Sequence, residues 1–126
     1  TRKQLTQKER KGQASFRKNI LHVYNGTCAI TGIKQKEVLE AAHIQTYINE
    51  ESNHIQNGIC LRVNIHKLFD NGLLSIDSNY RVVISSLLAT TAYKKIKGKK
   101  IKLPKDKSYY PSLKALGYHN KFKLRK

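Results

Sequence analysis

The spacing of apolar side chains predicts a helix near the start of the chain. Four of them recur at positions i, i+4, i+7 and i+8, which places them on one face of an amphipathic helix: Phe16, Ile20, Val23 and Tyr24. Asn25-Gly26 follows, a pair that commonly ends a helix. We therefore expect a helix over residues 15–24. A short extended piece over residues 28–32 should come next and close on a turn.

Two further apolar runs are short enough to be buried strands. They cover residues 38–44, ending in Ala42-His43-Ile44, and residues 59–63. The segment between them, 45–57, is polar and contains several asparagines, so it should form a long loop. Loops of this length without structure of their own usually have a functional role.

A short helix should follow the second strand. Asn64 is a plausible N-cap and Asn71-Gly72 a C-terminal stop. Its apolar face would consist of Ile65, Leu68 and Phe69. His66 and Asp70 are four residues apart, so their side chains should lie together on the neighbouring face.

The rest of the chain predicts a β-hairpin and one more helix. Residues 73–77 and 80–85 alternate around Ser78-Asn79, as the strands of a hairpin do. A basic, irregular stretch beyond Lys94 leads to a final helix over about residues 112–122. Helices mixed with antiparallel hairpins indicate the α+β class. A chain of 126 residues with 39% hydrophobic side chains should form a single domain over residues 1–126.

Composition limits the class of protein and the cellular compartment that the sequence suggests. No run approaches the roughly 18 apolar residues of a membrane-spanning helix, and the first twelve residues lack the apolar core of a secretory signal. Two cysteines cannot form a disulfide framework. We expect a cytoplasmic protein that does not associate with membranes.

The net charge of +17 is concentrated at the two ends of the chain. Residues 1–13 form a basic arm, and residues 94–126 form a basic flank with thirteen basic side chains against Asp106 alone. The core between them, 14–93, is almost neutral. A neutral core between basic flanks indicates a nucleic-acid partner. The alternative is a pair of solvated tails that keep the protein soluble.

Three central elements of the chain should bring reactive side chains together. A strand ending in His43, a loop reaching Asn57 and a helix presenting His66 and Asp70 would converge if the segment folds back on itself. Phosphodiester hydrolysis needs a base for water and a cation for the developing charge. Imidazole titrates near neutral pH, and a helical His–Asp pair is a workable clamp for a divalent metal.

These residues resemble a known family. The matching motifs are Cys28-x2-Thr31-Gly32, Glu40-Ala-Ala-His43-Ile44, His54-x2-Asn57-Gly58 and Leu61-Arg-x3-His66-x-Leu-Phe-Asp70-x-Gly72. Together they are similar to the HNH endonucleases, and most similar to those of bacterial restriction enzymes. The resemblance covers about residues 16–88. It implies a ββα-metal finger at about 37–72, with flanking helices and an additional β-hairpin.

The resemblance also implies roles. His43 would be the general base, Asn57 would fix the long loop and through it the base, and His66 would be a metal ligand on the helix. Asp70 falls where some relatives carry a second ligand, although it could instead orient His66. Arg62 would touch the scissile phosphate. Basic side chains on the helix and the C-terminal flank would contact DNA: Lys67, Lys94, Lys95, Lys97, Lys99 and Lys100.

The sequence departs from many relatives at two places. Ala42 stands where they carry a further metal ligand before the base, so the metal shell is thin and suits a cation that keeps several waters, such as Mg²⁺ or Mn²⁺. Many relatives also carry two zinc-binding CxxC pairs. Here those positions are Cys28 with Thr31 and Arg62 with Ile65, so no structural zinc is expected, and no small-molecule cofactor either.

The resulting prediction is a metal-dependent endonuclease for double-stranded DNA, which could form the nuclease part of a longer restriction enzyme. One site cuts one strand, so a double-strand break would need a homodimer or two visits. The alternative is a non-catalytic basic module that only binds nucleic acid. That alternative accounts for the charge but leaves the spacing of His43, Asn57 and His66 as a coincidence. A structural zinc module is disfavoured by the two lone cysteines.

Overall fold

A long helix opens the described part of the chain. The computed structural model describes residues 6–126, and helix α1 spans Gln7–Val23. The Thr6 hydroxyl accepts from the Glu9 backbone N–H while the Glu9 carboxylate accepts from the Thr6 N–H. This reciprocal cap starts the helix well before the predicted residue 15. The predicted basic arm over 1–13 is therefore helical from residue 7, and its Arg2 and Lys3 lie outside the described residues.

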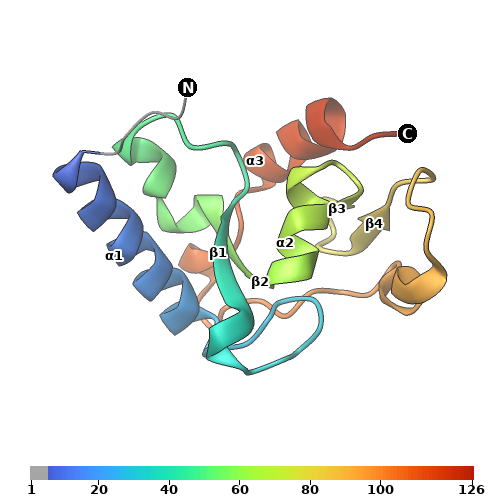
Figure 1. Ribbon diagram of the computed structural model, residues 1–126, viewed down its shortest axis with the longest axis horizontal. Helices are drawn as coiled ribbons and strands as arrows, with labels where there is room; N and C mark the ends of the chain where they lie inside the picture. Colours follow the sequence, from blue (N-terminus) through green and yellow to red (C-terminus); the bar gives the residue numbers. More distant parts are fainter. Residues whose placement is uncertain (1–5) are drawn as a thin grey trace.

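An antiparallel hairpin forms the centre of the molecule. Strand β1 (Leu39–His43) pairs with β2 (Gly58–Arg62), with His43 opposite Gly58 and Leu39 opposite Arg62. Helix α1 packs against this hairpin, and α2 contacts both strands as well (Figure 1). At Gly58 a Cβ atom would lie 2.4 Å from the Ile20 side chain. Glycine therefore lets α1 approach the strand closely, directly opposite His43.

Helix α2 (Val63–Asp70) follows β2 without a loop. The predicted N-cap at Asn64 is wrong: Arg62 occupies the cap position without a side-chain bond, and the Asn64 amide donates to the Tyr93 hydroxyl at 3.1 Å. The predicted stop is confirmed, since Gly72 has a φ of +70°, a conformation that glycine adopts readily. The order β1–β2–α2 is that of the expected finger.

The rest of the chain surrounds this unit. Strands β3 (Leu74–Ile76) and β4 (Val82–Ile84) form the predicted second hairpin. Helix α3 (Leu113–Tyr118) continues into a π-helical turn, His119–Lys123. Residues 28–32 form turns instead of the expected extended piece. The mixture of helices and antiparallel hairpins confirms the α+β class.

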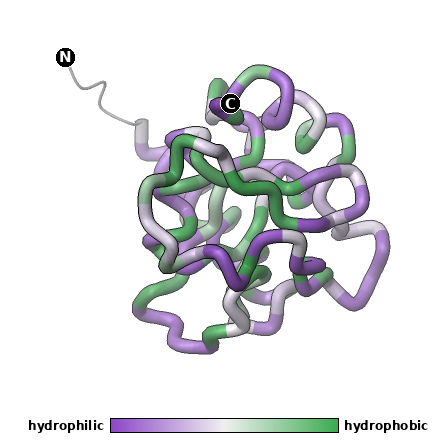
Figure 2. The backbone as a smooth tube through the Cα atoms, turned by 90° about the vertical axis from the view of Figure 1, so that its right-hand side faces the viewer, coloured by the Kyte–Doolittle hydropathy of each residue, from purple (hydrophilic) through white to green (hydrophobic). Residues whose placement is uncertain are grey.

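The basic C-terminal flank is packed against the fold and is not a free tail. The Ile101 side chain is only 4% exposed, and its backbone N–H donates to the Tyr80 carbonyl at 2.8 Å. The Lys102 N–H donates to the Ala29 carbonyl at the same distance. Figure 2 shows hydrophobic and hydrophilic stretches alternating along the chain. Within residues 6–126 no helix has the length and apolar character needed to cross a membrane.

Candidate active site

His43 ends strand β1 and is held on three sides. Its ring stacks on Phe16 with centroids 4.2 Å apart and planes 4° from parallel, while Tyr47 packs edge-on at 5.6 Å. Its Nε2 lies 2.8 Å from Oδ1 of Asn53. An amide oxygen can only accept a hydrogen bond, so Nε2 carries the proton. The lone pair of the neutral ring is therefore on Nδ1, which can accept a proton.

The surroundings keep His43 neutral. Burial lowers its pKa below the ordinary value, and the nearby His66 ring adds to that effect. The hydrogen bond to Asn53 and the charge of Asp70 oppose the shift without reversing it. An imidazole with a lowered pKa is unprotonated at neutral pH, which is the form that accepts a proton.

Asn57 ties the long loop together. Its Nδ2 donates to the carbonyls of Gln45 at 3.1 Å and Ser52 at 2.8 Å, and its Oδ1 accepts from the Gln45 N–H at 2.9 Å. No hydrogen bond between Asn57 and the His43 ring is present among the described residues. Any action of Asn57 on the base thus goes through the loop, as the resemblance implies.

Asn53 is the direct partner of His43, and sequence reasoning missed it. Nothing in its spacing separates it from the neighbouring asparagines of the loop, and Asn57 carried the family match. The structure distinguishes Asn53 from Asn57, because the short 3₁₀ turn over Glu50–Asn53 points the Asn53 amide oxygen at the His43 ring. The polar character of the loop was the only available signal.

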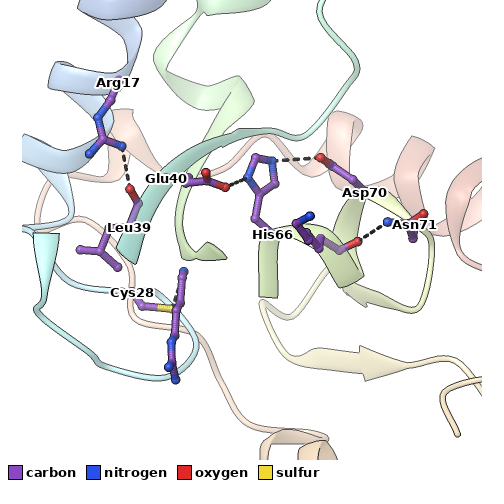
Figure 3. A network of polar contacts seen from close by, with 9 residues as sticks. Arg17, Cys28, Leu39, Glu40, His66, Asp70 and Asn71 are labelled. Atoms are coloured by element: carbon purple, nitrogen blue, oxygen red, sulfur yellow. Dashed lines mark hydrogen bonds and ion pairs between the residues drawn. The ribbon is translucent and has the colours of Figure 1, made fainter. Parts of the chain in front are cut away.

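His66 lies between two carboxylates on the exposed face of α2. Its Nδ1 is 2.7 Å from Oε1 of Glu40 on β1, and its Nε2 is 3.1 Å from Oδ2 of Asp70, one turn further along the helix (Figure 3). Burial alone would lower the pKa of His66, but Asp70 and Glu40 outweigh it and raise the pKa overall. Glu40 is therefore an ion-pair partner of His66 when the ring is protonated.

These donors fit a hard divalent cation. Glu40 can hold the Nδ1 proton, which leaves Nε2 free as a ligand, an arrangement common for metal-binding histidines. Two ligands at about 2.0–2.1 Å and in neighbouring positions of an octahedron lie roughly 3 Å apart, close to the 3.1 Å between Nε2 and Oδ2 of Asp70. Residues 6–126 contain no cluster of three or more such ligands. Water and substrate oxygens would have to complete the shell, as Mg²⁺ tolerates.

One cavity brings these groups together. It has a volume of about 370 Å³, and its lining includes His43, His66, Asp70, Tyr47 and Lys123. The His43 ring and the His66–Asp70 pair therefore line the same space. Asn57 lines the adjacent, larger cavity of about 740 Å³.

The predicted phosphate contacts lie elsewhere. Arg62 is at the other end of the hairpin from His43, and it lines a separate cavity with Tyr93, Lys95 and Lys99. Its contact with the scissile phosphate stays a prediction that this placement does not favour. The other basic side chains of the prediction are exposed, on α2 and on the C-terminal flank: Lys67, Lys94, Lys97 and Lys100.

Comparison with known proteins agrees with this geometry. Residues 28–77 match the family model of the HNH endonucleases. An HNH endonuclease domain covers these residues. The matched stretch of this HNH domain contains β1, β2 and α2 and thus His43, Asn57, His66 and Asp70. The prediction of an HNH endonuclease domain is confirmed for residues 28–77.

A solved structure shares the fold of the HNH domain. The modification dependent TagI restriction endonuclease superposes with a TM-score of 0.64 at 23% sequence identity. The match covers 84% of this chain and 36% of that one, so the present chain spans about a third of that structure's length. A search of curated proteins gave no significant match.

The positions of the absent zinc cysteines are joined by hydrogen bonds. The backbone N–H groups of Thr31 and Arg62 donate to the Cys28 sulfur at 3.4 Å and 3.3 Å. Cys28 and Cys60 are free and fully buried, as small hydrophobic residues are. In this HNH domain, one sulfur atom links the turn at residue 28 to the start of α2.

Proposed function

We propose that this domain hydrolyses phosphodiester bonds of double-stranded DNA with one divalent cation, as the nuclease part of a restriction-type enzyme. The observation that carries the proposal is the shared cavity. A neutral imidazole with an open Nδ1 and an imidazole–carboxylate pair suited to a hard cation line the same space. A base and a cation facing one point are what metal-assisted hydrolysis requires.

The chain's residues would divide the work as follows. Nδ1 of His43 takes a proton from water while the water oxygen forms a bond to phosphorus. The bond from phosphorus to the 3′ oxygen breaks, and that oxygen leaves with a proton from solvent. Asn53 keeps the proton on Nε2, and the Phe16 ring fixes the plane of the imidazole. A divalent ion on His66 and Asp70 would supply positive charge for the phosphate oxygens.

DNA is proposed as the substrate on charge and family grounds. The net charge of +17 favours a polyanion, and the structurally similar TagI protein is a restriction endonuclease by name. Mg²⁺ or Mn²⁺ is the proposed metal because the donors are nitrogen and oxygen. Cleavage of both strands would come from a two-fold dimer or from two successive encounters.

Nicking of supercoiled plasmid tests the proposal. The protein should convert it to open-circular or linear DNA with Mg²⁺ or Mn²⁺, and EDTA should stop the reaction. His43→Ala should slow cleavage by at least about 10²-fold, the low end of what a general base contributes, and leave DNA affinity nearly intact. His22→Ala, an exposed histidine on α1, is the matched control and should cut like the parent.

The opposite results are equally clear. If folded His43→Ala cuts within about tenfold of the parent, the base is misassigned. If the parent binds DNA but cuts none with any divalent metal, the non-catalytic binding module is the correct reading.

A further inference from the structure

The cavity lined by His43, His66 and His119 has one permanent positive charge among its described residues. Among its described lining residues, Lys123 is the only lysine or arginine, since Arg62 lines a different cavity. Lys123 also lines the larger neighbouring cavity, whose walls come from the loop 45–57 and α3. It therefore lies where the two cavities adjoin.

The backbone around Lys123 is fixed against the end of α2. His119 is only 2% exposed; its Nε2 donates to the Phe69 carbonyl at 2.9 Å and its Nδ1 accepts from the Ser75 hydroxyl at 2.7 Å. The His119 ring also stacks on Phe69 at 3.7 Å. These contacts join the π-helical turn to the helix that carries His66 and Asp70.

Gly72 completes this attachment. Its carbonyl accepts from the Arg125 N–H at 2.8 Å, and a Cβ atom at Gly72 would lie 2.1 Å from the Lys123 carbonyl oxygen. Only a residue without a side chain allows this approach. The Lys123 backbone is thus held on both sides, while its side chain remains exposed to solvent and available to a ligand.

We propose that the ammonium group of Lys123 binds a non-bridging oxygen of the phosphate that is cleaved. This inference rests on the proposed function and gives Lys123 the role that sequence reasoning gave Arg62. A phosphodiester gains negative charge on these oxygens while it is hydrolysed. Apart from Lys123, the charged side chain that lines this cavity is the carboxylate of Asp70. A preorganised cation there stabilises that charge without reorganisation.

Single-turnover cleavage at saturating DNA tests the assignment. Lys123→Ala should cut roughly 10²-fold more slowly, the loss typical of removing one charge-stabilising donor, and Lys123→Arg should recover most of the rate. Lys121→Ala is the matched control: this lysine is two residues away, lies over the Phe122 ring at 5.3 Å and lines neither cavity. It should cut like the parent.

A binding cycle separates a phosphate contact from a structural effect. An oligonucleotide duplex is made with a neutral methylphosphonate at the mapped cut position and compared with the unmodified duplex. The parent should lose affinity on the modified duplex, and Lys123→Ala should lose much less, because the contact is already gone. Equal losses in both proteins, or equal cleavage by Lys123→Ala and Lys121→Ala, would overturn the inference while the parent still cuts. A parent that cuts nothing refutes the proposed function itself.

Discussion

Replacing Asn53 should shift the pH dependence of cleavage in a direction set by the new side chain. Asn53 Oδ1 accepts from Nε2 of His43 at 2.8 Å, and this bond raises the pKa of His43 against the larger lowering by burial. Cleavage needs neutral His43, so activity rises with pH through that pKa. Asn53→Ala removes the bond and should move the rise to lower pH. Asn53→Asp puts a carboxylate beside Nε2 and should move it to higher pH.

The contacts of Asn53 set the size of these shifts. A carboxylate this close typically raises the pKa of a cationic partner by about 1–3 units, and each unit lowers the neutral fraction below the pKa about tenfold. The Asn53 Nδ2 is buried without a hydrogen-bond partner in the structure, so exchanging it for oxygen breaks no bond. In Asn53→Ala the Phe16 stack still holds the ring plane. The plateau rate of Asn53→Ala should therefore fall by about tenfold, which is less than the roughly 10²-fold minimum expected for loss of the base itself.

The assay is single-turnover cleavage from pH 5 to 9 with metal saturating at every pH. Saturation keeps the titration of His66 out of the profile. Asn57→Ala serves as the control for the loop, because it should lower the plateau rate without moving the pH at which activity rises. The reasoning is refuted if Asn53→Ala and Asn53→Asp keep the parent's melting temperature and shift the profile in the same direction or not at all.

Three further outcomes are expected. His66→Ala should abolish metal-dependent cleavage, and Asp70→Ala should weaken it less. In the parent, the affinity for Mn²⁺ measured by calorimetry should rise with pH, because the raised pKa of His66 keeps a competing proton on its ring. Equal affinity at pH 6 and pH 8 would contradict this. Gly72→Ala should lower the melting temperature by roughly 5–10 °C, from about 2 kcal/mol of left-handed strain and crowding, whereas Gly117→Ala, which meets no atom within 4 Å, should not. Six exposed lysines of the flank can be neutralised together: Lys94, Lys95, Lys97, Lys99, Lys100 and Lys102. Their loss should reduce the log–log slope of DNA affinity against salt concentration by about 0.9 per lost phosphate contact. An unchanged slope would show that these lysines face only solvent.

The sequence was most informative where the residues of the site lie on elements that the spacing of apolar residues also marks. The strand ending at His43 and the helix that presents His66 and Asp70 could be placed because apolar periodicity and turn residues both mark them. The bond from Asn53 to His43 could not, because it depends on how the loop 45–57 coils. The same holds for Lys123, which reaches the cavity from more than fifty residues beyond α2. Charge density suggested that the flank binds DNA, but only packing shows that Lys123 lines the cavity of His43 and His66.

The early start of α1 shows a different limit. The capping box at Thr6 and Glu9 is a recognisable signal, but the residues after it, 10–15, are polar or small and lack an apolar stripe. Tertiary support for that first part comes from the loop, where the Tyr47 hydroxyl donates to Glu9 at 3.3 Å. Long-range contacts of this kind are not visible in local sequence.

The attachment of residues 119–125 to the end of α2 bears on the order in which the nuclease matures during synthesis. A growing chain that has left the ribosome through residue 72 already contains His43, His66 and Asp70. The Phe69 carbonyl and the Gly72 carbonyl still lack His119 and Arg125, the groups that bond to them in the finished fold. Some fifty further residues must emerge first, several seconds of translation at about 5–20 residues per second. Under the proposed function, competence to cut would then arise only after residues 119–125 have emerged and bonded to the end of α2.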